Sequence, residues 1–446
     1  MNVQNDLLLL AYLARKIRLD QGLTLENLKD ENISVGTISN IENMEGNPSE
    51  SKVYYLFEML GYDREGVEEL KRRESLEMEI LRRKLECVES MLDDKDLAQT
   101  KVLLNRYMPS EYHALYPYAN YLKGLQAFAY NDIERAKKLW DKTIELCKKQ
   151  ILTAKQHLIA KCHNELSTCC YRKNNLQEAI YHVEKGLKQF KAEEQNEIKY
   201  ALICNHIFYL YRSGFIKESY LLLKRIWSSI HQIQRMRVKL LLHKLHCILL
   251  MKNNELDEAE RCCADSIEIT QCNLSQKSLL LDFLNILGSI YLKQGMYEQA
   301  LEYFYLALDM DAEQKSPRRH ADTYTYLTSL YTMQNKWAKA QDCMKNALSV
   351  GRKIKDDFRL VKILIISGVC IKKQKQYDKA IIYFKEAVQL CDKHDYFKQK
   401  CTAVYELIGC FDKMDHRKEF SQWAEEFYFL QRKLGWRLEA DLYDIF

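Results

Sequence analysis

Two side-chain sizes recur along most of the chain at a nearly constant interval. A small residue is followed four positions later by a bulkier one, and the small residue returns every 36 to 43 residues. Residues four apart share one face of an α-helix, so each copy predicts a helix that approaches its neighbour closely. The small residues are Thr100, Ala136, Ala179, Ser219, Ala259, Ala300, Ala340 and Ala380. One copy cannot bury its own apolar faces, so the copies are expected to stack.

The composition favours helices over strands. Only 14 glycines and 4 prolines interrupt 446 residues, which is few for an architecture built from strands and tight turns. The net charge of +5 is small for this length and indicates neither nucleic acid nor membrane by itself. We therefore expect an all-α chain.

The clearest copy of the repeat is LNILGSIYLKQGMYEQALEYFYLAL, at residues 284–308. Its Gly288, Tyr291, Gly295, Tyr297 and Ala300 resemble the tetratricopeptide pattern of paired antiparallel helices. The resemblance implies a right-handed superhelix with a concave inner wall. We assign residues 84–395 to such repeats of about 40 residues, and residues 396–446 to a degenerate repeat with capping helices.

The first 63 residues have the signals of several short helices. Thr24 and Ser34 are placed as N-caps and Gly22 and Gly61 as terminators. The helices are expected at Leu8–Arg18, Leu25–Glu31, Val35–Asn43 and Ser51–Leu60, with a Gly-Asn-Pro-Ser turn at residues 46–49. Residues 64–83 are predicted to form a linker helix whose apolar stripe continues from Val67 to Leu85.

Residues 8–62 resemble the Xre/Cro-type helix-turn-helix family through Gly22-Leu23-Thr24, Thr37-Ile38-Ser39, Ile41-Glu42 and Asn47-Pro48-Ser49. The resemblance implies a pair between Arg18 and Glu42, and base reading from the helix that begins at Val35. The residues at the reading helix are Ser34, Val35, Gly36, Thr37, Ser39 and Asn40, and because this face is sparse we expect Arg15 and Lys16 to add contacts to backbone phosphates. Asn40 is suited to adenine because its amide pairs bidentately with that base. Residues 1–62 carry about −4 in charge, so a degenerate domain that packs against something other than DNA stays open.

The order of the two parts and the repeat length resemble the RRNPP family of peptide-sensing regulators, on its PlcR and NprR side. The resemblance implies a cytoplasmic transcription regulator that binds double-stranded operator DNA as a homodimer and is switched by a short signalling oligopeptide. The alternative is a Rap-like protein-interaction module that binds and inhibits another regulator and has no operator of its own. Phosphatase action, known for some relatives, ranks third.

The inner wall is expected to carry the peptide. In tetratricopeptide folds the position fifteen before the small residue points inward, which gives a row that includes Asn164 and Asn285. In the third repeat the turn is one residue shorter, so Tyr211 is aligned with Tyr291, and this puts Asn205 in the same row. An asparagine pairs with the N–H and C=O of an extended peptide, and this family is known for such clamps. Cations and carboxylates on the same helices are expected toward opposite ends. The predicted peptide-binding residues are Tyr121, Lys161, Asn164, Arg172, Asn205, Arg212, Lys244, Asp282, Asn285 and Asp322. The alternative for each asparagine is a structural role, in which its side chain only hydrogen-bonds to a neighbouring loop.

No motif for catalysis, a cofactor or a metal is present in the sequence. His-Glu-x-x-His, a phosphate-binding glycine loop and Gly-x-Ser-x-Gly are all absent. The 15 cysteines include no Cys-x-x-Cys pair, and we interpret them as reduced, partly buried thiols. No signal peptide or membrane span is expected, so the chain is predicted to be cytoplasmic. Because the catalytic motifs are absent, we predict that it is not an enzyme.

Overall fold

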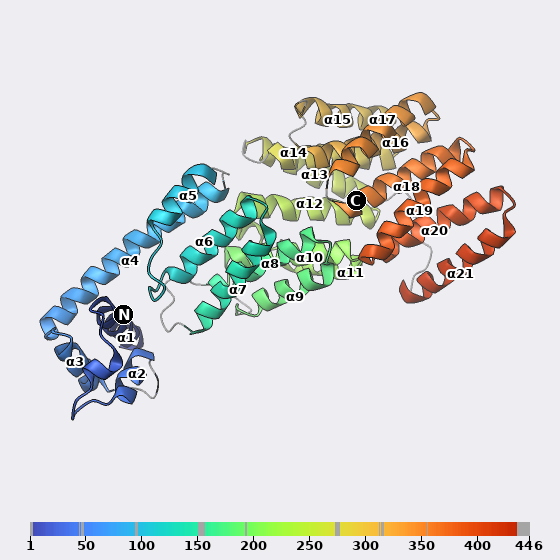
Figure 1. Cartoon of the computed structure of the whole chain (residues 1–446). Helices are drawn as coiled ribbons and strands as arrows, with labels where there is room; N and C mark the ends of the chain where they lie inside the picture. Colours follow the sequence, from blue (N-terminus) through green and yellow to red (C-terminus); the bar gives the residue numbers. More distant parts are fainter. Residues whose placement is uncertain are drawn as a thin grey trace. The chain divides into compact units, whose positions relative to one another are not determined.

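The computed structural model describes residues 3–43, 45, 49–93, 97–149, 157–191, 194–272, 277–311, 313, 316–354 and 356–434. These residues form 21 α-helices and two short 3-10 helices and contain no strand, which confirms the all-α prediction (Figure 1). The chain divides into two compact units. The first contains Met1–Cys169 and Lys185–Glu194, and the second contains Cys170–Glu184 and Gln195–Phe446.

The first unit begins with four short elements and continues into helical hairpins. Its helices are α1 (Val3–Asp20), η1 (Leu25–Leu28), α2 (Val35–Asn43), α3 (Glu50–Met59), α4 (Arg64–Asp93), α5 (Leu97–Arg106), α6 (Tyr116–Ala129), α7 (Ile133–Lys149) and most of α8 (Leu158–Arg172).

The second unit holds the last turn of α8 and the remaining helices, except for the end of α9 from Lys185 onward, which belongs to the first unit. They are α9 (Leu176–Leu187), α10 (Glu197–Arg212), α11 (Ile216–Trp227), η2 (Ile230–Gln232), α12 (Met236–Lys252), α13 (Leu256–Gln271), α14 (Lys277–Lys293), α15 (Tyr297–Met310), α16 (Pro317–Met333), α17 (Trp337–Lys353), α18 (Asp357–Lys373), α19 (Tyr377–His394), α20 (Phe397–Lys413) and α21 (Arg417–Leu434). Figure 1 shows α14 to α21 as successive antiparallel hairpins. The last pair, α20 and α21, is the predicted degenerate hairpin, and residues 435–446 lie outside the described residues.

The repeat predicted from the sequence is the organising feature of the core. All eight small residues lie on the second helix of a hairpin, and each is 0% exposed. The bulky residues four positions later are buried as well: Trp140, Val183, Leu223, Cys263, Phe304, Met344 and Phe384. The small residue removes side-chain volume where two helices meet, and the larger one fills the space between them. Each repeat therefore packs through the same two positions.

Glycine on the first helix completes this packing in three repeats, those of Gly124, Gly288 and Gly368, and the last two meet a phenylalanine ring. A Cβ atom at Gly288 would lie 2.6 Å from the Phe304 ring, and one at Gly368 would lie 2.4 Å from the Phe384 ring. No real Cβ atom tolerates such a contact, so these two helices reach their partners only because the side chain is missing. Phe304 also stacks on Tyr326 of the next repeat, with ring centroids 5.3 Å apart. One ring thus connects three helices.

The N-terminal helices enclose a small core of their own, which includes Leu13, Ile38, Ile41, Leu56 and Phe57. Helices α1, α2 and α3 form near their predicted positions.

The second predicted helix is an exception, because it is a single 3-10 turn, Leu25–Leu28, rather than a helix to Glu31. The Asp30 carboxylate accepts hydrogen bonds from the backbone N–H groups of Asn32 and Ile33, at 2.8 and 2.9 Å. A side chain that binds the backbone in this way stops a helix.

Helix α4 differs from the predicted linker. It runs without a break from Arg64 to Asp93, so the helix does not end near residue 83, and its C-terminal half forms a hairpin with α5. Val67 and Leu85 of its predicted stripe are buried, whereas Leu76 is 62% exposed and Ile80 is 44% exposed. The predicted turn at residues 46–49 falls largely on residues 46–48, outside the described residues.

No described helix has the combination of length and apolarity required to cross a bilayer.

Candidate binding surfaces

Helix α2 presents a polar, partly open face. Ser34 precedes it, and the Ser34 hydroxyl accepts a hydrogen bond from the Thr37 backbone N–H at 3.1 Å, so it acts as an N-cap. Ser34, Gly36 and Asn40 are exposed, and Val35, Thr37 and Ser39 are half-buried. Ile38 and Ile41 on the opposite face are fully buried. The helix is therefore anchored on one side and accessible on the other.

An internal ion pair fixes α2 against α1, as predicted. Arg18 Nε lies 2.6 Å from Glu42 Oε1, and a terminal nitrogen of the same guanidinium lies 2.8 Å from Oε2. The other terminal nitrogen donates to the Leu23 carbonyl oxygen at 2.8 Å. A bidentate pair of this kind specifies orientation because the guanidinium and the carboxylate are both planar. The side chains of Arg18 and Glu42 are buried.

The two basic residues predicted to contact DNA from α1 have different surroundings. Arg15 is exposed. Lys16 instead binds Glu74 of α4, whose side chain is 6% exposed and whose carboxylate also accepts a hydrogen bond from the Tyr12 hydroxyl at 3.1 Å. The ammonium of Lys16 compensates the charge of a buried carboxylate, so Lys16 is engaged within the chain and does not point to a DNA phosphate.

Lys161 in the first unit also has an internal partner. Its ammonium binds Glu89 of α4, and it lies 5.8 Å from the Tyr118 ring centroid and 5.4 Å from that of Tyr121. The Tyr118 hydroxyl donates to the same carboxylate at 2.6 Å. Burial raises the pKa of the Tyr118 hydroxyl, and the Glu89 charge raises it further. Lys161 is thus enclosed by two rings and a carboxylate.

Acidic residues in the second unit bind cations of neighbouring repeats. The Asp282 carboxylate lies 3.0 Å from Lys244 Nζ and 3.0 Å from an Arg319 terminal nitrogen. Burial acts to raise the pKa of Asp282, but these two cations outweigh it and hold the pKa below its ordinary value. Asp322 forms the equivalent contact with Arg359, at 2.7 and 2.8 Å.

These contacts differ from the prediction that cations and carboxylates gather at opposite ends of the inner wall. Asp282 and Asp322 each lie 37 residues before the arginine that they bind, so the same ion pair links successive hairpins twice. Arg319 and Arg359 were not among the predicted residues. The signal for them was present, because they are 40 residues apart, as are Asp282 and Asp322.

A second network brings α10 against α18, four hairpins further along the chain. The guanidinium carbon of Arg212 lies 3.4 Å from the Phe358 ring centroid, and one of its terminal nitrogens lies 3.8 Å from the Asp356 carboxylate. Arg359 also binds Asp356, and Arg318 lies 3.8 Å from it. Asp356 precedes α18 and caps it by accepting from the Arg359 backbone N–H at 3.1 Å. Arg212 therefore joins distant repeats.

Two buried groups in this network have no hydrogen-bond partner among the described residues. They are the Tyr211 hydroxyl and the Arg212 Nε, while Tyr211 as a whole is 8% exposed. Buried polar atoms are normally hydrogen-bonded, so such atoms mark a place where a ligand can supply the partner. Lys362 lies nearby, 4.9 Å from the Phe358 ring centroid. Burial and the Arg212 charge lower the pKa of Lys362 to about 7.

The predicted asparagine row is only partly accessible. Tyr121 and Asn285 are buried, whereas Asn164, Asn205 and Lys244 are half-buried. The Asn285 amide oxygen lies 2.9 Å from the Thr323 hydroxyl. Its amide nitrogen donates no hydrogen bond among the described residues, so Asn285 keeps a donor but not a full donor-acceptor pair. Asn164 donates to Glu165 at 3.1 Å, and Arg172 is exposed.

The cysteines are thiols, and none forms a disulfide. Most are buried, as predicted for small apolar side chains. Cys262 contacts Cys247 Sγ at 3.4 Å and His246 Nδ1 at 3.6 Å. Its hydrogen bond to Cys247, together with burial, raises the pKa of Cys262 to about 12, so this thiol stays protonated. Cys170 lies beside Glu178 and His182, which the sequence analysis did not anticipate.

Comparison with known proteins identifies the repeats. Two models described as tetratricopeptide repeat match residues 279–353 and 362–394. A sequence search of curated proteins found no match.

Solved structures resemble the chain over most of its length. A Rap protein complexed with Competence and Sporulation Factor is 14% identical, with a TM-score of 0.61 over 80% of this chain and 99% of the other. NprR in complex with its cognate peptide NprX is 13% identical, with a TM-score of 0.58 over 79% and 99%. The apo form of NprR from B. thuringiensis is 16% identical, with a TM-score of 0.56 over the same shares. The chain is therefore an all-α protein of tetratricopeptide repeats with the fold of Rap and NprR.

Proposed function

We propose that the chain is a cytoplasmic transcription regulator that binds operator DNA through α2 and is switched by a short oligopeptide on the inner face of its repeats. The observation that carries the proposal is the network of Arg212, where two buried polar atoms have no hydrogen-bond partner among the described residues. Buried polar atoms are normally hydrogen-bonded, so these two call for a partner. An extended peptide supplies backbone carbonyls and carboxylates, which are the acceptors that both groups require.

The DNA-binding part of the proposal rests on the surroundings of α2. A helix that enters a groove needs one face held by the domain and the other free of it. Ile38, Ile41 and Glu42 form the held face, and Gly36 and Asn40 are exposed. Arg15 on α1 is the exposed basic residue for a backbone phosphate, whereas Lys16 is occupied by Glu74. We assign base recognition to Asn40 within a helix-turn-helix.

The peptide is proposed to bind near Asn205, Arg212 and Asn285. Asn205 on α10 is half-buried, and the amide nitrogen of Asn285 on α14 is available as a donor. Asp282 and Asp322 then act as links between repeats, because their carboxylates already bind arginines.

A switch requires a ligand to bind two conformations unequally. Arg212 joins α10 to α18 across four hairpins, so a ligand that engages Arg212 changes a contact on which the curvature of the second unit depends. Leu76 and Ile80, exposed one turn apart on α4, are proposed to pack against a second copy in a homodimer. Two DNA-binding heads would then meet an operator with two half-sites.

The DNA part is tested by selecting duplexes from a randomised library with the full chain and measuring gel shifts at fixed salt. Asn40→Ala should weaken binding to the selected duplex by about tenfold and relax the preference at one base pair, because one bidentate contact contributes about 1–3 kcal/mol. Asn43→Ala is the matched control, since Asn43 is exposed at the C-terminal end of the same helix.

Equal affinity and equal base preference for Asn40→Ala and the unmodified chain would refute this assignment. If the full chain enriches no duplex even at low salt, the Rap-like alternative is favoured, in which the array binds another protein.

A further inference from the structure

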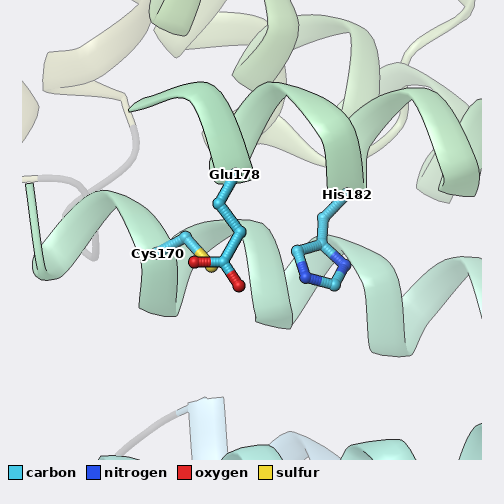
Figure 2. Close-up of side chains that lie close together, drawn as sticks. All are labelled: Cys170, Glu178 and His182. Atoms are coloured by element: carbon cyan, nitrogen blue, oxygen red, sulfur yellow. The ribbon is translucent and has the colours of Figure 1, made fainter. Parts of the chain in front are cut away.

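Three side chains with metal-binding chemistry meet where α8 ends and α9 begins. The Cys170 thiol, the Glu178 carboxylate and one ring nitrogen of His182 all lie within 4.8 Å of one another. Figure 2 shows the three side chains on the same side of the hairpin, with the sulfur and the carboxylate nearest each other. No other group of three such side chains gathers this closely among the described residues.

The helical geometry explains the convergence. Glu178 and His182 are four residues apart on α9, so they project from the same face in successive turns. Cys170 lies in the last turn of α8, which leads through a short turn into α9. Cys170 is 1% exposed, so its sulfur is shielded from solvent on the side of the core. The two donors on α9, Glu178 and His182, and the one donor on α8, Cys170, therefore lie around a common point.

A neighbouring residue orients the carboxylate. The Asn175 side-chain nitrogen donates to Glu178 Oε2 at 3.0 Å, and the Asn175 side-chain oxygen accepts from the Glu178 backbone N–H at 3.1 Å. Asn175 thus caps α9 and holds one carboxylate oxygen, so the direction of the other is restricted. Partners of this kind around a metal ligand raise affinity because they reduce the freedom that binding must remove.

We propose that Cys170, Glu178 and His182 form a binding site for a zinc-like divalent transition metal. A thiolate, an imidazole and a carboxylate are a donor set that zinc accepts, whereas magnesium and calcium prefer oxygen donors alone. The donor atoms would move together by about 1 Å, because ligands at zinc distances of about 2.0–2.3 Å lie about 3.5 Å apart.

Three protein ligands leave the fourth position of a tetrahedral ion to water. Binding requires the Cys170 thiol to release its proton to solvent, and His182 must be neutral, so affinity should increase with pH. The bound ion would connect the end of α8 to α9 and stabilise that hairpin turn.

Cobalt(II) is the probe for this site, because a thiolate ligand gives it an intense ligand-to-metal charge-transfer absorption. The full chain, reduced and free of added metal, should bind one equivalent of cobalt(II) with this band, and zinc(II) should displace it. Cys170→Ser should abolish the band, and Glu178→Gln should weaken binding by at least about tenfold. Cys262→Ser is the matched control, since Cys262 contacts Cys247 and His246 without forming a group of three donors as close as the proposed one, and it should keep the band.

A chain without the band, or a band of equal intensity in Cys170→Ser, would overturn the proposal. Circular dichroism establishes whether each variant keeps its helices. If Cys170→Ser unfolds, His182→Gln decides, because its side chain is half-buried and its loss should remove the ion while the helices persist. The result is independent of peptide or DNA binding, so it stands or fails separately from the proposed function.

Discussion

Lys362 lies among the charged groups of the Arg212 network. The positive charges that face it belong to Arg212 and Arg359, and the negative ones belong to Asp322 and Asp356. Burial and the Arg212 guanidinium lower the pKa of the Lys362 ammonium to about 7, although both carboxylates act in the opposite direction. In the unfolded chain the lysine has its ordinary pKa of about 10.4, so it loses its proton only near that pH. The folded state therefore loses this proton about three pH units earlier than the unfolded state.

The free energy of unfolding should consequently rise with pH in the window above 7. Between that value and the unfolded pKa, the unfolded state holds the proton of Lys362 and the folded state does not, so higher pH favours folding. From pH 6 to pH 8 the contribution is about 1 kcal/mol. Denaturant titrations of the unmodified chain and of Lys362→Met at both pH values measure it.

Lys362→Met should lack this part of the rise, so the unfolding free energy of the unmodified chain minus that of Lys362→Met should increase by about 1 kcal/mol from pH 6 to pH 8. Comparing the two chains cancels the other titrating groups. Equal pH dependence in both would show that Lys362 keeps an ordinary pKa.

Two residue positions on the second helix of each hairpin determine how the helices pack. A small residue and a bulkier one four positions later account for the contact in every repeat from α7 to α19. Gly288 and Gly368 extend the rule to the first helix, because Phe304 and Phe384 press against them. Gly36 of α2 offers a useful contrast, since the nearest atom to a Cβ there would be the Ser34 hydroxyl at 3.8 Å.

Gly288→Ala should lower the free energy of unfolding by about 1–3 kcal/mol, because Phe304 must shift to admit the methyl group. Gly36→Ala should instead raise the helical stability of α2 by about 0.5–1 kcal/mol, since alanine loses less backbone entropy in a helix. Thermal and denaturant unfolding of the two variants test the contrast. A Gly288→Ala chain as stable as the unmodified one would mean that the Phe304 ring has room to move.

The sequence predicts this packing well because it depends on local size alternation. The eight small positions, α2 with its Arg18–Glu42 pair and the last hairpin were all found from spacing and from resemblance. The 3-10 turn at Leu25 was missed because Asp30 competes for backbone N–H groups further along. The continuation of α4 to Asp93 was partly indicated, because the apolar stripe runs on to Leu85 and no residue in the segment ends a helix; only the boundary at residue 83 was set too early.

Side-chain partners were harder to predict than helices. Lys16, Lys161, Asp282 and Asp322 all have internal partners, and each partner lies 37 to 72 residues away in the sequence. Such pairs depend on how hairpins stack, which single-residue spacing does not specify. Only the Asp-to-Arg spacing of 37 residues repeats, so only that pair carried a usable signal.

The second unit as a whole contains contacts that a simple stack of hairpins does not need. A repeat in a solenoid usually contacts only its neighbours, but Arg212 of α10 reaches Phe358 and Asp356 at α18. Such a contact depends on the summed rotation of four repeats, so a small change at each repeat breaks or forms it. We infer that the proposed oligopeptide acts on DNA affinity by changing the Arg212 contact.

The most direct test measures DNA affinity with and without peptide. Short peptides are selected from a random displayed library on the immobilised full chain, and an enriched peptide is added to gel shifts of the selected duplex. The peptide should move the midpoint by about tenfold or more in the unmodified chain, within the usual range of coupling between sites. It should do the same in Arg352→Gln, whose arginine lies on a second helix and is 51% exposed, but should not move the midpoint in Arg212→Gln. A midpoint that no enriched peptide moves, or that moves equally in Arg212→Gln, would contradict the account.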